Sequence, residues 1–571
     1  MDDLSGGGAE GIVTLDELRE MKGYFLELLG SGNEEVRGYA WGSVRRFVLL
    51  GVLTLDEVKE RKGSFFKLLA SQDENVRFYA WDQVYKLVDL GVITKGDLHV
   101  FLELLKSRDE GVRSNAWEGF CGPPSESAFP QYWGVVVSTL VTRETSEVFL
   151  EFLESQDVDL RSRAWYGVPC LLSGGVVTPD EIEGRKAYFL ELLESKDERS
   201  RSWAWDAAVS LLGKGVISTG DLIQRKAYFL ELLRSDHSGV RYEAWRTGLE
   251  LADKGVLTPE ELRREREHSL KLLEDQDALT RMNAWAIVEN LIDMGVIARE
   301  DSRLFLGLLG SPDPCARRDA WSRVKALMDG GILTPDEVRE RKHYFFELLK
   351  SKDADVRRLA WDTVSKLIEA GVVSREDSHA LTALLESPDE DLRLDAWEVV
   401  DGLVEGGVLH LQEVMNRTTY FMDMLKSDNE DVRNWAWFDA VDLVDKGVLA
   451  RDQLAEMRGH FLSLLESRKG ETRLRAWETA EYLAGEGIVT LDELRERKGY
   501  FLELLKSPDE EVRLNSWYAV DGLIEAGILA EDEVMEMKGY YLELLKSKDE
   551  EVRWQAWDSV GGKWVIVGDL S

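Results

Sequence analysis

The sequence has 571 residues, too many for one compact hydrophobic core, and it carries 108 acidic against 71 basic residues for a formal net charge of −37. This balance argues against nucleic acid and anionic membranes as general partners, because binding to phosphate groups depends on lysine and arginine. It allows basic proteins, basic peptides or cations as partners, and its simpler interpretation is the solubility of a large surface.

The first residues, "MDDLSGGGAEG", contain neither a basic region nor an apolar core of the kind found in signal peptides. No run of 18 apolar residues occurs, so we expect no membrane span and no membrane partner. The three cysteines, Cys121, Cys170 and Cys315, stand far apart and do not form a disulfide framework. These features predict a soluble, cytoplasmic protein.

A tryptophan recurs along the chain at intervals of 36 or 40 residues and, once, 48 residues, which predicts an array of similar units. The fourteen positions are Trp41, Trp81, Trp117, Trp165, Trp205, Trp245, Trp285, Trp321, Trp361, Trp397, Trp437, Trp477, Trp517 and Trp557. The length of the chain therefore reflects one repeat array rather than several unrelated domains.

Residues 54–91, "TLDEVKERKGSFFKLLASQDENVRFYAWDQVYKLVDLG", show two predicted helices in one unit. The first helix begins at Thr54, which forms a capping box with Glu57, and Ser or Thr holds this place in ten of the fourteen units. The second begins after Asp73 and ends at Gly91, and Gly recurs at that position in twelve units. Apolar residues at helical spacing follow one side of each helix, so stacked pairs can bury them.

The pattern D-x-x-V-R-x-x-A in the second helix resembles the signature of HEAT repeats. It is seen in Asp73, Val76, Arg77 and Ala80, in Asp353, Val356, Arg357 and Ala360, and in Asp549, Val552, Arg553 and Ala556. The resemblance implies an all-α, right-handed α-solenoid of about fourteen two-helix repeats with a period of 36–40 residues. A Trp follows the Ala here, where that family usually has a small residue. HEAT repeats mostly form binding surfaces for many unrelated partners.

The expected organisation follows from the repeats and their boundaries. It consists of a tail and partial repeat end at 1–13, repeats one to three at 14–120, an irregular insertion at 121–141, repeats four to fourteen at 142–562, and a tail at 563–571.

An Arg stands four residues before the repeat Trp in all fourteen units, and an Asp precedes the Arg by four residues in ten. The resemblance implies that this Asp and Arg pair along the stack as a structural ladder, while the Trp fills the core. The representative members are Asp73, Arg77, Trp81, Asp353, Arg357, Trp361, Asp509, Arg513 and Trp517. Because the motif hardly differs between units, we interpret it as architecture rather than as a ligand site.

Departures from the repeat are better candidates for function. The first helices that begin at Thr94, Thr142, Ala298 and Ser374 lack four residues, close to one helical turn. Between Trp117 and Trp165 the chain carries an insertion rich in proline, and its aromatic residues are a candidate partner-binding loop. These residues are Phe129, Tyr132 and Trp133. The alternative is a hinged unit whose aromatics refill the core.

Two other candidates lie on the second helices. Trp203 and Trp435, each two residues before a repeat Trp, are candidate surface anchors. Carboxylates recur four and eight residues after the repeat Trp, along one row of the helix. The candidate partner-binding members are Glu369, Asp401, Glu405, Asp445, Glu481, Asp521 and Glu525. The resemblance implies that this row lines a concave side, where it would attract a cationic partner, and the alternative is an ordinary solvated helix face.

The seven histidines are scattered, and no metal-ligand spacing, phosphate-binding loop or catalytic triad can be found. We therefore expect no catalytic residue, metal or cofactor. The leading hypothesis is a non-catalytic scaffold that binds a protein with a basic or extended segment. One alternative is a structural rod or spacer that self-associates through uncapped ends of the array. The other is a HEAT-like DNA glycosylase, against which the lack of a basic face speaks.

Overall fold

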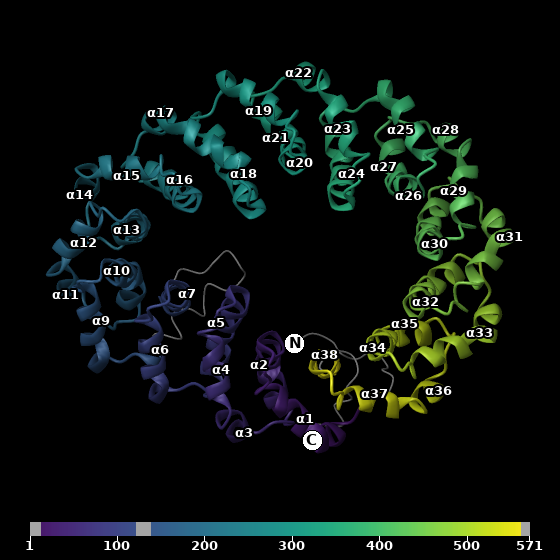
Figure 1. The fold of residues 1–571 in the computed structure, drawn as a ribbon, viewed down its shortest axis with the longest axis horizontal. Helices are drawn as coiled ribbons and strands as arrows, with labels where there is room; N and C mark the ends of the chain where they lie inside the picture. The colour runs from purple at the N-terminus through teal and green to yellow at the C-terminus, as the bar shows by residue number, and fades with distance from the viewer. Residues whose placement is uncertain (1–12, 122–138, 561–571) are drawn as a thin grey trace. The chain divides into compact units, whose positions relative to one another are not determined.

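The computed structural model describes residues 13–121 and 139–560, and all regular structure in these parts is helical. The described residues form two compact units. The N-terminal unit comprises residues 14–297 together with 557–560, and the C-terminal unit comprises residues 298–556 together with Val13. Within each unit the helices follow one another in pairs, and the second helices of successive pairs lie side by side as one layer (Figure 1). The expected all-α array of HEAT-like helix pairs is confirmed.

In the N-terminal unit the first helices of successive repeats are α1 (Leu15–Leu28), α3–α4 (Leu55–Lys59, Lys62–Leu68), η1–α6 (Lys95–Asp97, Leu98–Leu105), η2–α9 (Arg143–Thr145, Ser146–Leu153), α11–α12 (Pro179–Glu183, Lys186–Leu192), α14–α15 (Thr219–Ile223, Lys226–Leu232) and α17–η3 (Pro259–Leu270, Lys271–Glu274). The second helices are α2 (Glu34–Leu49), α5 (Glu74–Asp89), α7 (Glu110–Cys121), α10 (Val158–Ser173), α13 (Glu198–Gly213), α16 (Ser238–Asp253) and α18 (Ala278–Asp293).

In the C-terminal unit the first helices are η4–α19 (Arg299–Asp301, Ser302–Leu308), α22–α23 (Pro335–Arg339, Lys342–Leu348), η5–α25 (Arg375–Asp377, Ser378–Leu385), α28–α29 (Leu411–Met415, Thr418–Met424), α31 (Arg451–Leu462), α33 (Leu491–Leu504) and α36–α37 (Glu531–Met535, Lys538–Leu544). The second helices are α20–α21 (Pro314–Ser322, Val324–Asp329), α24 (Ala354–Glu369), α26–α27 (Glu390–Glu398, Val400–Glu405), α30 (Glu430–Asp445), α32 (Gly470–Gly485) and α34–α35 (Glu510–Tyr518, Val520–Glu525). The last helix is α38 (Glu550–Ser559).

The ends of the helices are set by the residues that the sequence pattern predicts. Thr54 and Glu57 form the reciprocal capping box of α3, and Asp73 accepts hydrogen bonds from the backbone N–H groups of Asn75 and Val76 at the start of α5. All twelve glycines that stand ten residues after a repeat Trp adopt φ between 66° and 73°. This left-handed conformation ends the second helix and favours glycine because it has no Cβ.

The repeat tryptophans form the core between successive repeats. All fourteen are buried, and many contact an aromatic ring of the following first helix in a tilted arrangement, as Trp165 does with Phe189 at 5.1 Å and Trp437 with Phe461 at 5.6 Å. The indole N–H often donates to a leucine carbonyl of its own repeat, as Trp41 does to Leu29 at 3.1 Å. The interpretation of the Trp as core is confirmed.

Residues 557–560 belong to the N-terminal unit through contacts with the first repeat. The Trp557 ring lies 5.4 Å from the rings of Phe25 and Phe47, and Asp558 accepts a hydrogen bond of 3.0 Å from Ser43 Oγ. Asp558 also pairs with Arg46 at 2.9 Å. Self-association of the chain stays a prediction, which light scattering across a concentration series would test.

Two details differ from the expected pattern of one continuous helix per segment. Most full-length first helices break into two pieces, and a β-branched residue stands beside the break in each of them. These residues are Val58, Ile182, Ile223, Val338, Val414 and Val534. Five of these residues stand at the fourth position of the helix, where the four continuous helices have Leu18, Leu262, Leu454 and Leu494. The exception is α14, in which Leu222 holds the fourth position and Ile223 follows it. Branching at Cβ restricts χ1 and disfavours the helix, which favours a break at this place.

The short first helices replace their missing turn with a 3₁₀ turn, as η5 does before α25. Pro169 lies inside α10 without ending it. Most of the expected insertion at 121–141, including Phe129, Tyr132 and Trp133, lies outside the described residues.

Candidate functional site

The repeated Arg links its own loop to the next repeat, and its partners differ from those that the resemblance implies. Arg77 Nη1 donates to the Ser71 carbonyl at 2.6 Å, and Arg77 Nε donates to Asn115 Oδ1 of the next repeat at 2.8 Å. Arg357 likewise donates to the Ser351 carbonyl and pairs with Asp395. Arg513 donates to the Ser507 carbonyl at 3.2 Å.

The N-cap Asp residues serve mainly their own helices. Asp353 and Asp509 accept from the backbone N–H groups two and three residues later, as Asp73 does. The pKa of Asp109 is lowered mainly by the hydrogen bond from the Val112 N–H of its own helix. The charge of Arg77, from the preceding repeat, lowers it further, so an electrostatic interaction between repeats also exists. The Asp, Arg and Trp of each repeat are therefore engaged within the fold and leave little for a ligand.

The capping-box carboxylates form a second set of links, along the first-helix layer, that sequence reasoning missed. Most of them cap their own helix and also pair with a Lys or Arg of the preceding repeat. Such pairs are Lys22–Glu57 at 2.6 Å, Arg143–Glu181 at 2.6 Å, Lys186–Asp221 at 3.0 Å, Arg299–Glu337 at 2.6 Å and Arg458–Glu493 at 2.7 Å. The signal was present in the sequence as a basic residue near the start of the first helix: Lys22, Lys186 and Arg458 stand five residues after the capping box, and Arg143 and Arg299 stand directly after the cap residue.

The predicted carboxylate row divides into two sets. The residues eight positions after the repeat Trp are exposed at the ends of α24, α27, α30 and α35, namely Glu369, Glu405, Asp445 and Glu525. Those four positions after it are half-buried, namely Asp401, Glu481 and Asp521. The first set is therefore the more accessible of the two.

Asp401 shows how the half-buried set is engaged. Its carboxylate pairs with the ammonium group of Lys446 from the next repeat. Burial acts to raise the pKa of Asp401, but the hydrogen bond from Lys446 outweighs it and lowers the pKa below its ordinary value. Asp401 is thus compensated within the protein, and the exposed set is the better candidate for a cationic partner.

Exposed aromatic residues lie on the same second helices of the C-terminal unit. Trp435 and Phe438 of α30 are each 48% exposed, and their rings contact each other at 6.0 Å. The Arg475 guanidinium of α32 lies 5.8 Å from the Trp435 ring. Tyr482 and Tyr518 are 58% and 45% exposed. Trp435 is therefore accessible, as a surface anchor requires.

Trp203 in the N-terminal unit is less accessible than Trp435. It is half-buried between the Arg163 guanidinium at 4.8 Å and the Tyr166 ring at 5.4 Å. Burial, together with the charges of Asp206 and Glu118, raises the pKa of Tyr166. Trp203 thus contributes to packing between second helices.

Two polar clusters on the second-helix layer were not predicted. In the N-terminal unit Arg246 pairs with Asp206 at 2.6 Å and with Glu243 at 2.9 Å. In the C-terminal unit Asp439 is half-buried, and burial, with the charges of Glu398 and Asp442, raises its pKa to about 8. The sequence offered a signal for Asp439, which stands two positions after Trp437, because the other repeats have mostly small or neutral residues at this place.

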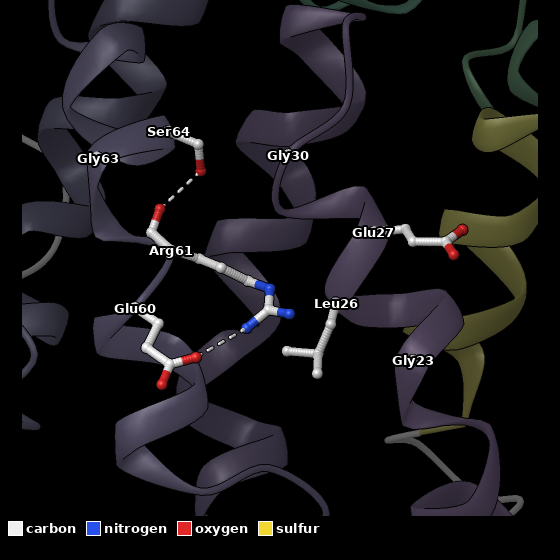
Figure 2. Close-up of a pocket in the computed structure, with 8 residues that line it drawn as sticks. All are labelled: Gly23, Leu26, Glu27, Gly30, Glu60, Arg61, Gly63 and Ser64. Atoms are coloured by element: carbon white, nitrogen blue, oxygen red, sulfur yellow. Dashed lines mark hydrogen bonds and ion pairs between the residues drawn. The ribbon is translucent and has the colours of Figure 1, made fainter.

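An open groove of about 560 Å³ lies between the first helices of repeats one and two (Figure 2). Gly23 and Leu26 of α1 and Gly30 line one side, and Arg61 and Ser64 line the other. Figure 2 shows the Arg61 guanidinium extending towards Leu26. Glu27 and Glu60 also line the groove, so its lining combines the Arg61 guanidinium, two carboxylates and the Ser64 hydroxyl with glycines and the Leu26 side chain.

Within residues 13–121 and 139–560, no group of three or more His, Cys, Asp and Glu side chains is placed to hold a metal ion. No helix in these same ranges combines the length and the apolar character that crossing a membrane requires.

Comparison with known proteins gives only distant similarity. No protein-family model matches the sequence, and no curated protein sequence matches it. Among solved structures, yeast importin-beta (Kap95p) aligns with a TM-score of 0.47 at 12% identity, over 95% of this chain and 73% of that chain. A structure of importin beta aligns with a TM-score of 0.44 at 13% identity, over 95% and 78%. Kap121p aligns with a TM-score of 0.40 at 14% identity, and this chain spans 56% of its length.

Proposed function

We propose that this chain is a non-catalytic scaffold that holds a protein partner with a basic or extended segment along the second helices of the C-terminal unit. The observation that carries the proposal is the set of exposed carboxylates at the ends of four of the five second helices from α24 to α35. We call Glu369, Glu405, Asp445 and Glu525 the acidic row.

The acidic row suits an extended segment because three consecutive repeats offer a carboxylate at the same position, and Glu525 offers another beyond the repeat that has Gly485 there. Lysine and arginine side chains spaced along a peptide can each meet one carboxylate, and long-range attraction raises the rate of encounter. The accessible rings of Trp435 and Phe438 add apolar area on a helix of the same layer. The repeated Asp, Arg and Trp make contacts within the fold, so the specificity for a partner depends on the surface residues that vary between repeats.

The test is charge reversal of the acidic row, with Glu369, Glu405, Asp445 and Glu525 all changed to Lys. The probe is a fluorescently labelled peptide of alternating lysine and serine, followed by anisotropy at low and physiological salt. We expect binding to weaken about tenfold or more, and binding to the unchanged protein to weaken as salt is raised.

A matched control reverses four exposed glutamates of the first-helix layer of the same unit, Glu340, Glu376, Glu496 and Glu536. The control has the same net charge as the test variant. Equal weakening by both variants would show that only net charge matters, and unchanged binding by the test variant would refute the proposal.

A further inference from the structure

The groove at Arg61 belongs to a position that repeats along the first-helix layer. At four junctions in which the second repeat has a full-length first helix, a Glu that follows the Leu-Leu or Phe-Leu pair of one repeat binds an Arg of the next. The pairs are Glu154–Arg185 at 2.7 Å, Glu194–Arg225 at 2.8 Å, Glu386–Arg417 at 2.6 Å and Glu466–Arg497 at 2.9 Å. The Arg therefore faces a place that is shaped for a carboxylate from the neighbouring repeat.

The residues at this junction vary together within the chain. We call the place of the Glu the first position and the place of the Arg, 31 residues later, the second position. Arg234 holds the first position and Glu265 the second at one junction, so the same pair forms with its charges exchanged, at 2.6 Å. Where the first position is Lys426 or Lys506, the second is methionine. Matching of charge between the two positions is thus a rule of the junction, and exceptions to it are informative.

The junction between repeats one and two breaks this rule. Gly30 stands where the Glu is expected, yet Arg61 is kept. Arg61 Nη1 donates to the Glu57 carbonyl of its own helix at 2.9 Å, and its contact with Glu60 is long, at 3.9 Å. The carboxylate that other repeats provide across the junction has no counterpart here.

A ring that fills this region elsewhere is also replaced. Ser64 holds the position that is tyrosine at Tyr188, Tyr228, Tyr344, Tyr420 and Tyr500. A second Gly–Arg junction, Gly310 with Arg341, is filled, because Tyr344 lies 3.1 Å from the place of a Cβ on Gly310. At Gly23 and Gly63 a Cβ would meet no atom within 4 Å. Compared with the junctions that carry both residues, the groove at Arg61 therefore lacks a Glu side chain and a Tyr ring, and the space of both is open.

We propose that the Arg61 groove binds an acidic side chain of a partner protein, with its carboxylate in the place that Glu194 takes at Arg225. An aromatic residue next to that acidic residue would occupy the room that Ser64 leaves. This inference is independent of the proposed function, because it concerns the first-helix layer and a partner segment of opposite charge.

Carboxylates near Arg61 do not prevent such binding. Glu60 has a counterpart in Glu496, which lies 3.9 Å from Arg497 while Arg497 still holds Glu466 at 2.9 Å. Glu27 has a counterpart in Glu191, which stands three residues before Glu194 in a junction that forms. The chain itself thus shows that an Arg in this setting takes another carboxylate.

The experiment uses the full chain and the peptide acetyl-Leu-Leu-Glu-Tyr-amide, with acetyl-Leu-Leu-Gln-Tyr-amide as the neutral match, followed by ligand-observed NMR. We expect the Glu peptide to bind about fivefold more tightly than the Gln peptide. Arg61→Gln should remove this preference. Arg341→Gln changes the filled junction and should leave it unchanged.

A second variant keeps Arg61 and fills the groove from within. Gly30→Glu should restore the junction, block the Glu peptide, and raise Tm slightly in a way that Arg61→Gln abolishes. Equal binding of the two peptides, or binding that survives Gly30→Glu, would overturn the proposal. The lysine-serine peptide should bind all these variants alike, so failure here is distinguishable from failure of the acidic-row proposal.

Discussion

At the scale of single residues, Asp439 has the most unusual environment among the carboxylates of the second-helix layer. It lies half-buried on α30, and burial together with Glu398 and Asp442 raises its pKa to about 8. In the unfolded chain the same group has a pKa of about 4. Between these values the folded protein binds a proton that the unfolded chain has released, so the free energy of unfolding falls as pH rises.

We predict that Asp439→Asn removes this pH dependence. The variant should match the unchanged protein near pH 4 and be more stable at pH 8 by roughly 1–2 kcal/mol, because no charge needs to be buried. Urea denaturation of both proteins across this range measures the difference in the free energy of unfolding, with Asp445→Asn, an exposed residue of the same helix, as control. Parallel stability curves for Asp439→Asn and the unchanged protein would contradict the prediction.

Residues that repeat could be predicted from the sequence, whereas residues that face a neighbouring repeat could not. The core Trp, the cap at Asp73 and the left-handed Gly91 each solve a problem internal to one unit, so counting reveals them. The surroundings of Asp439 depend on Glu398 from the preceding repeat, and one-dimensional spacing does not show which side chains meet. The roles of the acidic row stay predictions for the same reason.

At the scale of elements, the capping-box carboxylates join consecutive first helices. Glu493 accepts a hydrogen bond of 2.9 Å from the Thr490 backbone N–H and pairs with Arg458 of the preceding repeat at 2.7 Å. Burial acts to raise the pKa of Glu493, but the hydrogen bonds from Arg458 and Thr490 outweigh it and hold the pKa at about 2. One side chain thereby stabilises both a helix start and a junction between repeats.

We predict that Glu493→Gln lowers the free energy of unfolding at pH 7 by roughly 1–2 kcal/mol. Because the folded pKa is depressed, this stability is present above the unfolded value of about 4.5 and is lost as pH falls towards 2. The difference in the free energy of unfolding between the variant and the unchanged protein should therefore disappear at low pH. Denaturation with urea at several pH values measures it, and a gap that is constant with pH would count against the role of the charge. Glu496→Gln, an exposed neighbour on the same helix, should have little effect.

The helices themselves were predicted better than their breaks. Helix α33, "LDELRERKGYFLEL", is continuous, while the closely similar "PDEVRERKHYFFEL" is divided into α22 and α23. The fourth residue, Leu494 in one and Val338 in the other, differs in branching at Cβ. A break of this kind depends on a small difference in propensity, which a search for apolar periodicity does not detect.

At the scale of the whole molecule, most of the described contacts join each repeat to its neighbours in sequence, and the contacts of Trp557 with Phe25 and Phe47 of the first repeat are an exception. The Trp stack, the capping-box pairs and the Glu–Arg junctions all connect one repeat to the next. Stability should then be a sum of contributions from repeats and from the interfaces between them. The period and the type of unit are predictable from sequence because every interface repeats them, but the surfaces vary freely and need the structure.

This nearest-neighbour organisation predicts a local response to a core substitution. Trp437 is fully buried, its ring lies 5.6 Å from the tilted Phe461 ring, and its indole N–H donates to the Leu425 carbonyl at 3.1 Å. Trp437→Ala removes all three contributions and should cost about 3–5 kcal/mol. Hydrogen exchange should speed up most in α29, α30 and α31, while the helices of residues 14–297 keep their protection.

Trp435→Ala, two residues away and 48% exposed, serves as the control and should change hydrogen exchange little. A uniform loss of protection throughout the chain after Trp437→Ala would mean that the array unfolds as one cooperative block, contrary to the neighbour-by-neighbour contacts described above.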